Sequence, residues 1–381
     1  MDSLIARHRL LALLTLWLVL LGVGLGQAAQ AASQLTDLAG RSVRSPTKVQ
    51  RILLGEGRFI SALAILEREN PLARVVGMQG EFKFLDPDGY AQYRERFPAI
   101  DDIPRVGHLA PASFSAEKAI ALAPDLAVFG LEGHGPSPRD HELVIRLERA
   151  GVAVVFIDFR SAPLENTPRS IELLGAVLGR EREAAEFLDF YRGELARVTK
   201  RLAGVSAMPR VFIENRVGLS KECCATMANG MMGRFVDRAH GLNIAKGLIP
   251  GTHGHLSLEY LLGHQPDVYI GTGIGSSASQ TQSPERIALG AGVKPEMARA
   301  SLLRAASRPG IVELDAMRSG QAYAIWHHFY NSPLNVVAVQ VFAKWLHPQR
   351  FADLDPQDTL ERLFARFQPV PAAGTYWVAL K

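Results

Sequence analysis

The chain has few cysteines, little net charge and only one long apolar run. Its 381 residues include two cysteines, Cys223 and Cys224, which are adjacent. Adjacent cysteines can form a vicinal disulfide or remain thiols, but they cannot tie distant parts of the chain together, so a disulfide-stapled scaffold is excluded. The formal net charge is +4 at pH 7. That value is small for this length and argues against nucleic-acid binding.

Familiar catalytic motifs are also missing. The sequence contains no Gly-x-Ser-x-Gly elbow, no His-Glu-x-x-His helix and no Cys-x-x-Cys pair. The glycine-rich stretch 271–275 (GTGIG) lacks the Gly-Lys-Ser/Thr of a nucleotide-binding loop and does not fit the dinucleotide fingerprint. No motif therefore points to a reaction class.

The one long apolar run lies at the amino terminus. Arg7 and Arg9 precede an apolar stretch over residues 10–26, and Ala29-Gln30-Ala31 fits a small-residue cleavage pattern. We therefore expect residues 1–31 to be a cleaved signal peptide and the mature protein to lie in the periplasm. No cysteine stands near the junction to carry a lipid. The run has the minimum length for a membrane-spanning helix, so an uncleaved anchor is the alternative.

One sequence pattern occurs twice. In each copy a serine at a predicted helix N-cap is followed by a glutamate in the first turn, where the helix dipole favours a carboxylate. A proline then ends the helix, and an apolar run typical of a buried strand follows. The separation of the copies is close to the size of a domain, which favours two similar lobes over a solenoid. The repeated positions are Ser115, Glu117, Pro124 and Asp125, and then Ser257, Glu259, Pro266 and Asp267.

Strand-like and helical stretches alternate on both sides of a long helix predicted over residues 181–202. Such alternation is typical of parallel sheets covered by helices on both faces. Apolar residues at helical spacing make the long helix a rigid connector. The sequence therefore predicts an α/β protein of two Rossmann-like lobes with parallel sheets, joined by one long interdomain helix. The expected division is signal peptide 1–31, N-terminal lobe 32–180, connecting helix 181–203 and C-terminal lobe 204–381.

Arginines follow predicted strands at matching places in the two lobes. In parallel sheets, ligands meet the loops that leave the carboxyl ends of strands. Arg160 and Arg216 each stand just past such a strand. Two guanidinium groups facing each other across an interlobe cleft would suit an anionic ligand. The alternative is ordinary pairing with Asp158 or Glu214. Arg58 belongs to a loop ahead of a helix, where backbone N–H groups can also contact an anion.

The stretch WHHFYN directly follows another predicted strand. Imidazole and phenolate groups can complete the coordination of Fe(III) in an incompletely wrapped chelate, and aromatic rings stack on flat organic surfaces. We therefore predict Trp326, His327 and Tyr330 as ligand contacts, and His327, His328 and Tyr330 as candidate metal ligands. A packed aromatic corner of the lobe is the alternative.

With these features together, the chain resembles the helical-backbone (class III) substrate-binding proteins of bacterial ABC importers, which serve ferric siderophores, haem and cobalamin. The most specific likeness lies in the opening TDLAGRSV with the strand RILL, the two Ser-x-Glu…Pro-Asp units and the central helix. The resemblance implies that Glu117 and Glu259, one on each lobe, dock onto arginines of a membrane permease. It also implies that strand-end arginines and aromatic residues line a shallow cleft.

We therefore expect a monomeric binding protein with no intrinsic cofactor that captures an iron chelate, a ferric siderophore. It would deliver this chelate to the ABC permease and ATPase complex of the inner membrane. Haem or cobalamin is the nearest alternative, because arginines and aromatic surfaces also suit a tetrapyrrole with acidic side chains. An alternative from another class is a periplasmic metal-dependent hydrolase or chelatase that uses His253, His255, His327 and His328.

Overall fold

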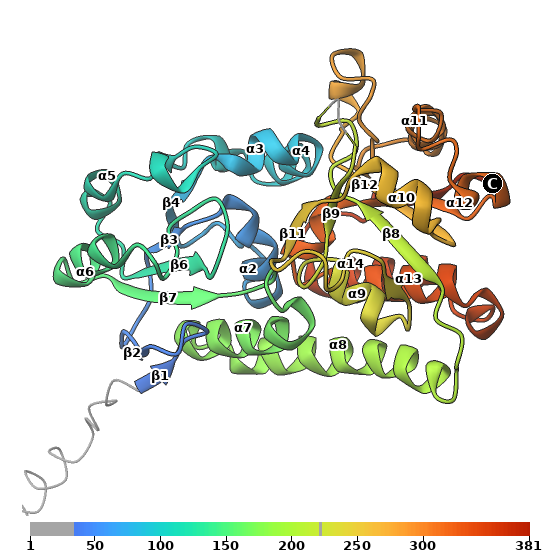
Figure 1. Ribbon diagram of the computed structural model, residues 1–381. Helices are drawn as coiled ribbons and strands as arrows, with labels where there is room; N and C mark the ends of the chain where they lie inside the picture. The colour runs from blue at the N-terminus through green and yellow to red at the C-terminus, as the bar shows by residue number, and fades with distance from the viewer. Residues whose placement is uncertain (1–33, 221–222) are drawn as a thin grey trace, which may run out of the picture.

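The computed structural model describes residues 34–220 and 223–381. A five-stranded sheet precedes the long helix α8 (Glu181–Leu202), and a seven-stranded sheet follows it. Figure 1 shows the two sheets side by side, with α8 running along one side of the molecule under both. The prediction of a two-lobed α/β fold with a connecting helix is thus confirmed.

The first sheet is parallel throughout, in the order β5-β4-β3-β6-β7. Its central strands are continuous apolar runs whose residues are all buried, as expected where helices cover both faces. The strands are β3 (Ile52–Leu54), β4 (Val75–Gln79), β5 (Arg105–Gly107), β6 (Leu126–Gly130) and β7 (Ala153–Ile157), preceded by the hairpin β1 (Gln34–Thr36) and β2 (Ser42–Arg44). The helices are α2 (Ile60–Leu66), α3 (Glu81–Leu85), α4 (Pro87–Arg96), α5 (Ala116–Ala121), α6 (His141–Arg149) and α7 (Pro163–Leu178).

The second sheet is mixed, in the order β11-β9-β8-β12-β14-β16 with β10 beside β8. The strands β8, β12 and β14 are parallel, whereas β9, β11 and β16 join antiparallel. The strands are β8 (Arg210–Glu214), β9 (Ala225–Met227), β10 (Leu242–Asn243), β11 (His253–His255), β12 (Val268–Gly273), β14 (Ala322–Trp326) and β16 (Trp377–Ala379), with the separate pair β13 (Gly290–Ala291) and β15 (Gly374–Thr375). The helices are α9 (Gly233–Arg238), α10 (Leu258–His264), α11 (Pro295–Ala306), α12 (Asp315–Ser319), α13 (Asn335–Leu346) and α14 (Pro356–Phe367).

Short 3-10 turns connect several of these elements. They are η1 (Gly57–Phe59), η2 (Pro98–Asp101), η3 (Pro111–Ser113), η4 (Ala278–Thr281), η5 (His327–Asn331) and η6 (Pro348–Phe351). Two of them carry residues that the sequence singled out: η1 begins shortly after the end of β3, and η5 directly follows β14.

The repeated sequence pattern forms the same structural unit in both lobes. The Ser115 hydroxyl accepts a hydrogen bond from the backbone N–H of Lys118 at the start of α5, and Ser257 does the same for Tyr260 at the start of α10. The next strands, β6 and β12, each lie inside their sheets. The prediction of a capped helix followed by a buried strand is confirmed in both copies.

Helix α8 packs against both lobes. Its apolar face contacts α7 on the first lobe and α13 on the second. The Tyr191 hydroxyl donates a 2.7 Å hydrogen bond to the Asn335 side chain, and the ring of Phe187 meets that of Phe367 edge-on. One buried hydrophobic cluster extends through both lobes. The lobes are thus joined by a shared core as well as by the chain.

The predicted signal peptide, residues 1–31, lies outside the described residues. Within 34–220 and 223–381, no helix has both the length and the apolar character needed to cross a bilayer.

Candidate functional site

The loops that leave the carboxyl ends of both sheets meet at the boundary between the lobes. In the first lobe these loops follow β3, β6 and β7, and in the second they follow β8, β12 and β14. The backbone N–H of Met231 donates to the Arg160 carbonyl across the boundary, at 2.8 Å. The Asn331 side chain of the second lobe reaches Glu56 of the first at the same distance. The strand ends of the two lobes therefore form one continuous site.

Glu56 is the centre of this boundary. One carboxylate oxygen accepts hydrogen bonds from the backbone N–H of His134 at 3.0 Å and from the Arg160 guanidinium at 3.3 Å. The other accepts from Arg58 at 2.9 Å and from Asn331 at 2.8 Å. Burial alone would raise the pKa of Glu56, but the charges of Arg160 and Arg58 outweigh it and lower the pKa to about 2. Glu56 therefore stays charged and holds together segments of both lobes.

Arg58 is enclosed in the same network. Its guanidinium contacts Glu56, the Glu81 carboxylate at 3.5 Å and the Nδ1 atom of His328 at 2.8 Å. Glu81 also accepts the backbone N–H groups of Gly57 and Arg58, which holds the turn after β3 in place. Burial raises the pKa of Glu81 to about 7 against the opposing charge of Arg58. Arg58 thus binds the lobes to each other, and its predicted contact with a ligand stays a prediction.

His328 has no free ring nitrogen in this structure. Arg58 donates to its Nδ1, so its Nε2–H donates to the Leu85 carbonyl at 2.8 Å. Among the described residues, no group of three or more histidine, cysteine, aspartate or glutamate side chains is placed to hold a metal ion. The metal set predicted from His327, His328 and Tyr330 remains a prediction, and His328 would have to break one of its two hydrogen bonds to take part.

His327 and Tyr330 belong to the same turn, η5, and lie close to Arg160 of the first lobe. The Arg160 guanidinium stacks over the Tyr330 ring, 5.3 Å from its centroid, and the His327 ring meets Tyr330 edge-on. Burial, followed by the charges around it, lowers the pKa of His327 well below its usual value, so the ring is neutral. Trp326 packs edge-on against His328 and Tyr376 and is largely buried.

The two strand-end arginines do not form the pairs proposed as the alternative. The Asp158 carboxylate accepts the backbone N–H groups of residues 160–162, so it shapes the loop after β7 and does not contact the Arg160 guanidinium. Glu214 is bound by Arg308 through both guanidinium nitrogens and accepts the Tyr269 hydroxyl. Within residues 34–220 and 223–381, the side chain of Arg216 therefore has no acidic partner.

Arg216 is exposed and has an unusual backbone conformation. Its φ of 53° lies in the left-handed region, and its N–H donates to the Thr272 hydroxyl at 2.7 Å. No hydrogen bond or ion pair of its guanidinium is formed within residues 34–220 and 223–381. A strained residue at a strand end is a common feature of binding sites.

Arg160 and Arg216 act on the same histidine. Burial lowers the pKa of His253 first, and the charges of Arg216 and Arg160 lower it further. His253 and His255 project from β11, which pairs with β9 directly after the vicinal disulfide between Cys223 and Cys224. The charges of Arg160 and Arg216, which belong to different lobes, thus both lower the pKa of His253.

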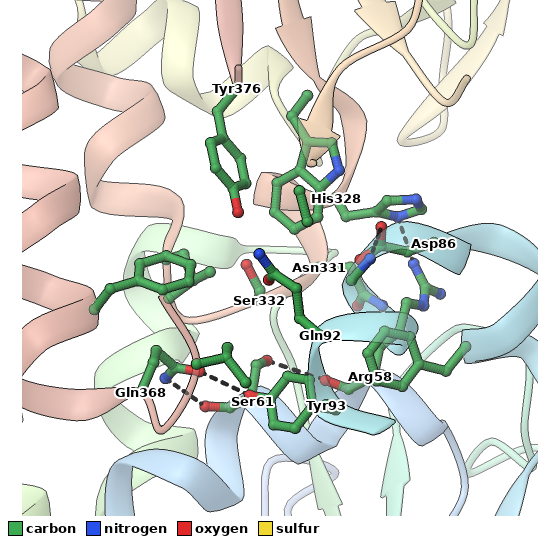
Figure 2. A pocket seen from close by; sticks show the side chains of 17 residues that line it. Arg58, Ser61, Asp86, Gln92, Tyr93, His328, Asn331, Ser332, Gln368 and Tyr376 are labelled. Carbon is green, nitrogen blue, oxygen red and sulfur yellow. Dashed lines mark hydrogen bonds between the residues drawn. The ribbon is translucent and has the colours of Figure 1, made fainter. Parts of the chain in front are cut away.

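A small cavity lies behind the charged network, between the lobes. Its volume is about 50 Å³, enough for one or two water molecules. Figure 2 shows Arg58 and His328 on one side, with Tyr376 and Gln368 from the second lobe facing Tyr93 from the first. Burial raises the pKa of Asp86, which also lines this cavity, to about 6. The space is too small for a chelate and belongs to the lobe contact.

The two predicted docking glutamates lie in the first turns of α5 and α10, and both are exposed. Glu117 forms a 2.6 Å ion pair with Arg146 of α6. Glu259 has no side-chain partner among the described residues. Their position at equivalent corners of the two lobes follows from the internal repeat.

Several residues of the site were not expected from the sequence. Glu56, Glu81, Thr272 and Asn331 hold the arginines and histidines in place. The sequence predicted Arg58 of this loop as a ligand contact and the loop as a source of backbone N–H groups, but it indicated no role for Glu56. The one available signal was an acidic residue between two glycines directly after a buried strand, which is too common to identify a buried network.

Comparison with known proteins agrees with this architecture. A family model described as "Periplasmic binding protein" matches residues 87–293, more than half of the chain. No curated protein matches the sequence significantly. A protein described as a TroA-like periplasmic binding protein, FepB from Veillonella parvula, is similar in structure with a TM-score of 0.79 at 23% identity. The match covers 91% of this chain and 99% of that one.

Two further solved structures share the fold. The molybdate periplasmic binding protein MolA of an ABC transporter from Haemophilus influenzae has a TM-score of 0.67 at 18% identity, covering 90% of this chain and 99% of its own. A periplasmic heme binding protein from Pseudomonas aeruginosa has a TM-score of 0.54 at 20% identity, with 79% and 93% covered. Together with the family match, the two-lobed fold and the long connecting helix show that the chain belongs to the periplasmic binding protein family, the solute-binding class that serves ABC transporters.

Proposed function

We propose that this protein captures an anionic iron chelate, a ferric siderophore, between its lobes and delivers it to an inner-membrane ABC permease and its ATPase. In this proposal residues 1–31 direct export to the periplasm, and the protein works as a monomer without chemistry on its ligand. The ligand contacts are Arg160, Arg216, His327 and Tyr330, with Trp326 behind them. Arg58 contributes by fixing the lobe boundary.

The observation that carries the proposal is the free guanidinium of Arg216. Other arginines at this boundary are paired with acidic side chains, as Arg58 is with Glu56 and Arg308 is with Glu214. Arg216 instead combines exposure, a strained backbone and the absence of a partner among the described residues. Its charge acts on His253 together with that of Arg160 from the other lobe. A ligand with several anionic oxygens would satisfy both groups by charge-assisted hydrogen bonds.

The direct test is titration of the mature protein with four probes, followed by tryptophan fluorescence. The probes are an iron(III) tris-catecholate, which is anionic, an uncharged iron(III) tris-hydroxamate, haem and cobalamin. We expect saturable quenching by the tris-catecholate. Haem is the second candidate, since its carboxylates would also suit two arginines and one structurally similar protein is described as heme-binding. Binding of none of the four, with metal held tightly by the purified protein, would instead favour the hydrolase alternative.

Substitution of Arg216 tests the role of its charge. Arg216→Gln should weaken binding of the anionic probe at least about tenfold, the typical worth of one charge-assisted hydrogen bond. Arg139 is an exposed arginine in the loop before α6, so Arg139→Gln is the matched control and should leave binding unchanged. If the Arg216 variant and the parent protein bound the anionic probe with equal affinity, Arg216 would not be a ligand contact.

Delivery to a permease is tested separately from binding. Replacing Glu117 and Glu259 by glutamine should abolish uptake of the chelate in cells, while the affinity of the purified protein stays unchanged. Glu165, exposed on α7, provides a control as Glu165→Gln. Normal uptake by the double variant would refute the docking role of the two glutamates.

A further inference from the structure

Thr272 connects the two halves of the candidate site on the second lobe. It lies within β12, between the parallel neighbours β8 and β14, and is completely buried. Its hydroxyl oxygen accepts the backbone N–H of Arg216, past the end of β8, at 2.7 Å. The same oxygen lies 3.1 Å from the Nδ1 atom of His327, past the end of β14. A single hydroxyl thus touches both of the groups that flank the ligand position.

The hydrogen-bond chemistry of this hydroxyl fixes the direction of each bond. A threonine hydroxyl has one proton to donate and two lone pairs that accept. One lone pair is used by the Arg216 N–H, which can only donate. Among the described residues the Nδ1 atom of His327 is the one other partner of the hydroxyl, so the proton goes to Nδ1. A buried hydroxyl proton left unpaired would be costly.

The tautomer of His327 follows from that bond. A neutral imidazole carries one proton, and a ring whose Nδ1 accepts a hydrogen bond carries it on Nε2. The Nε2 atom of His327 has no partner within the described part of the chain, and it is not sealed from solvent. The ring thus carries an N–H donor, and not a lone pair, at Nε2, in contact with Tyr330 and within the influence of the charges of Arg216 and Arg160.

We propose that Thr272 is a positioning residue that fixes His327 as a hydrogen-bond donor, so that His327 contacts an anionic oxygen of the ligand and not its metal ion. The same hydroxyl holds Arg216 in its left-handed conformation. This inference rests on the proposed function. It limits the ligand to a chelate whose metal ion is fully coordinated by the chelator and whose anionic oxygens face outward. Metal coordination by His327 would require the opposite tautomer, with Nδ1–H donating to Thr272.

The first experiment uses the ligand-free protein. Nitrogen-15 correlation spectra of the histidine rings identify the tautomer, with the His327 signal assigned by its loss in His327→Asn. We expect the Nε2–H tautomer in the parent protein and in Thr272→Ser, which keeps the hydroxyl. Thr272→Val removes the hydroxyl at nearly constant shape and with it the preference for Nε2–H, so the Nδ1–H tautomer should become detectably populated. An Nδ1–H tautomer in the parent protein, or no change in the valine variant, would overturn the proposal.

The second experiment measures binding. Thr272→Val should weaken binding of the iron(III) tris-catecholate at least about tenfold, because two contacts lose their support, whereas Thr272→Ser should stay within about threefold. The serine variant separates the loss of the hydroxyl from a general loss of packing. Equal weakening by both variants would show that Thr272 acts only through its packing and would overturn the positioning role.

A third measurement distinguishes the two possible partners of His327. Addition of Zn²⁺ alone to the ligand-free protein should leave the Nε2–H signal of His327 in place. Loss of that signal with saturable Zn²⁺ binding would make His327 a metal ligand and overturn the proposal. If the tris-catecholate fails to bind the parent protein, the proposed function fails, but the tautomer and Zn²⁺ measurements still decide the role of Thr272.

Discussion

At the scale of single residues, two acidic side chains near the lobe boundary respond to burial in opposite ways. The pKa of Glu56 is lowered because two guanidinium groups outweigh the effect of burial. Asp86 has the Gly89 N–H as a hydrogen-bond donor and forms no ion pair with any described residue, so burial dominates and raises its pKa from 3.8 to about 6. The carboxylate of Glu56 favours folding at neutral pH, whereas that of Asp86 opposes it.

The pH dependence of stability tests this assignment for Asp86. Because its folded pKa lies above the unfolded value, folding loses stability as the pH rises from 3.8 to about 6 and the loss is constant above that. Asp86→Asn removes the charge and keeps an N-cap side chain for α4. The variant should therefore gain stability relative to the parent protein across this window, by roughly 3 kcal/mol at neutral pH. Urea unfolding of the variant and of the parent protein at pH 4 and pH 7 measures this gain in stability.

A control for this experiment is Asp355→Asn, which changes an exposed aspartate that caps α14 in the same way. The difference in unfolding free energy between this control variant and the parent protein should be the same at pH 4 and at pH 7. A pH-independent difference for the Asp86 variant as well would contradict the assignment of a raised pKa to this carboxyl group.

At the scale of elements, the two capped helices α5 and α10 test the internal repeat. Each begins with a serine whose hydroxyl accepts a hydrogen bond from the third following residue. Ser115→Ala and Ser257→Ala should each lower the free energy of unfolding by about 1 kcal/mol, the usual worth of an N-cap. The sites lie in different lobes, so the double variant should show the sum. Chemical denaturation provides the measurement.

Restoration of the cap provides the control. Ser115→Asp and Ser257→Asp keep an acceptor at the N-cap and add a favourable charge at the helix start, so stability should stay near the parent value. If the alanine variants were as stable as the aspartate variants, the caps would contribute nothing and the repeat would be a similarity of sequence alone.

Elements with strong local signals were predictable from the sequence, and those defined by distant partners were not. The helix predicted over residues 181–202 occurs with those bounds because its apolar spacing is a local property. The antiparallel strands β9, β11 and β16 are each only three residues long, and their direction depends on the strand with which they pair. The sequence contains no signal for these pairings, so the second sheet was expected to be parallel.

The candidate site shows the same division. Arg160 and Arg216 were found because a residue just past an apolar run is visible in the sequence. Besides the neighbouring Arg58, the buried Glu56 depends on three donors from segments that are far apart in the chain, so no local pattern reveals it. The partners of a residue decide whether it binds a ligand or another part of the protein. That is why Arg58 and Arg216 looked alike in sequence and differ in structure.

At the scale of the whole molecule, the lobes are joined on two sides of the boundary. On the side of the strand ends, Arg58 bonds to His328 and Glu56 bonds to Asn331. On the other side, α8 shares its apolar face with helices of both lobes. Two attachments of this kind leave little freedom for the lobes to open about α8. Ligand capture should therefore cost little reorganisation, which favours a preformed site.

The expected consequence is a single cooperative unfolding transition. Because one hydrophobic cluster runs through both lobes, neither lobe should unfold while the other stays intact. Asn331→Ala removes one hydrogen bond between the lobes and leaves Glu56 with three donors, so it should lower the free energy of unfolding by about 1–3 kcal/mol without splitting the transition. Differential scanning calorimetry of the two proteins decides this. Two resolved transitions in the parent protein would mean that the lobes fold independently and that the boundary network joins them only weakly.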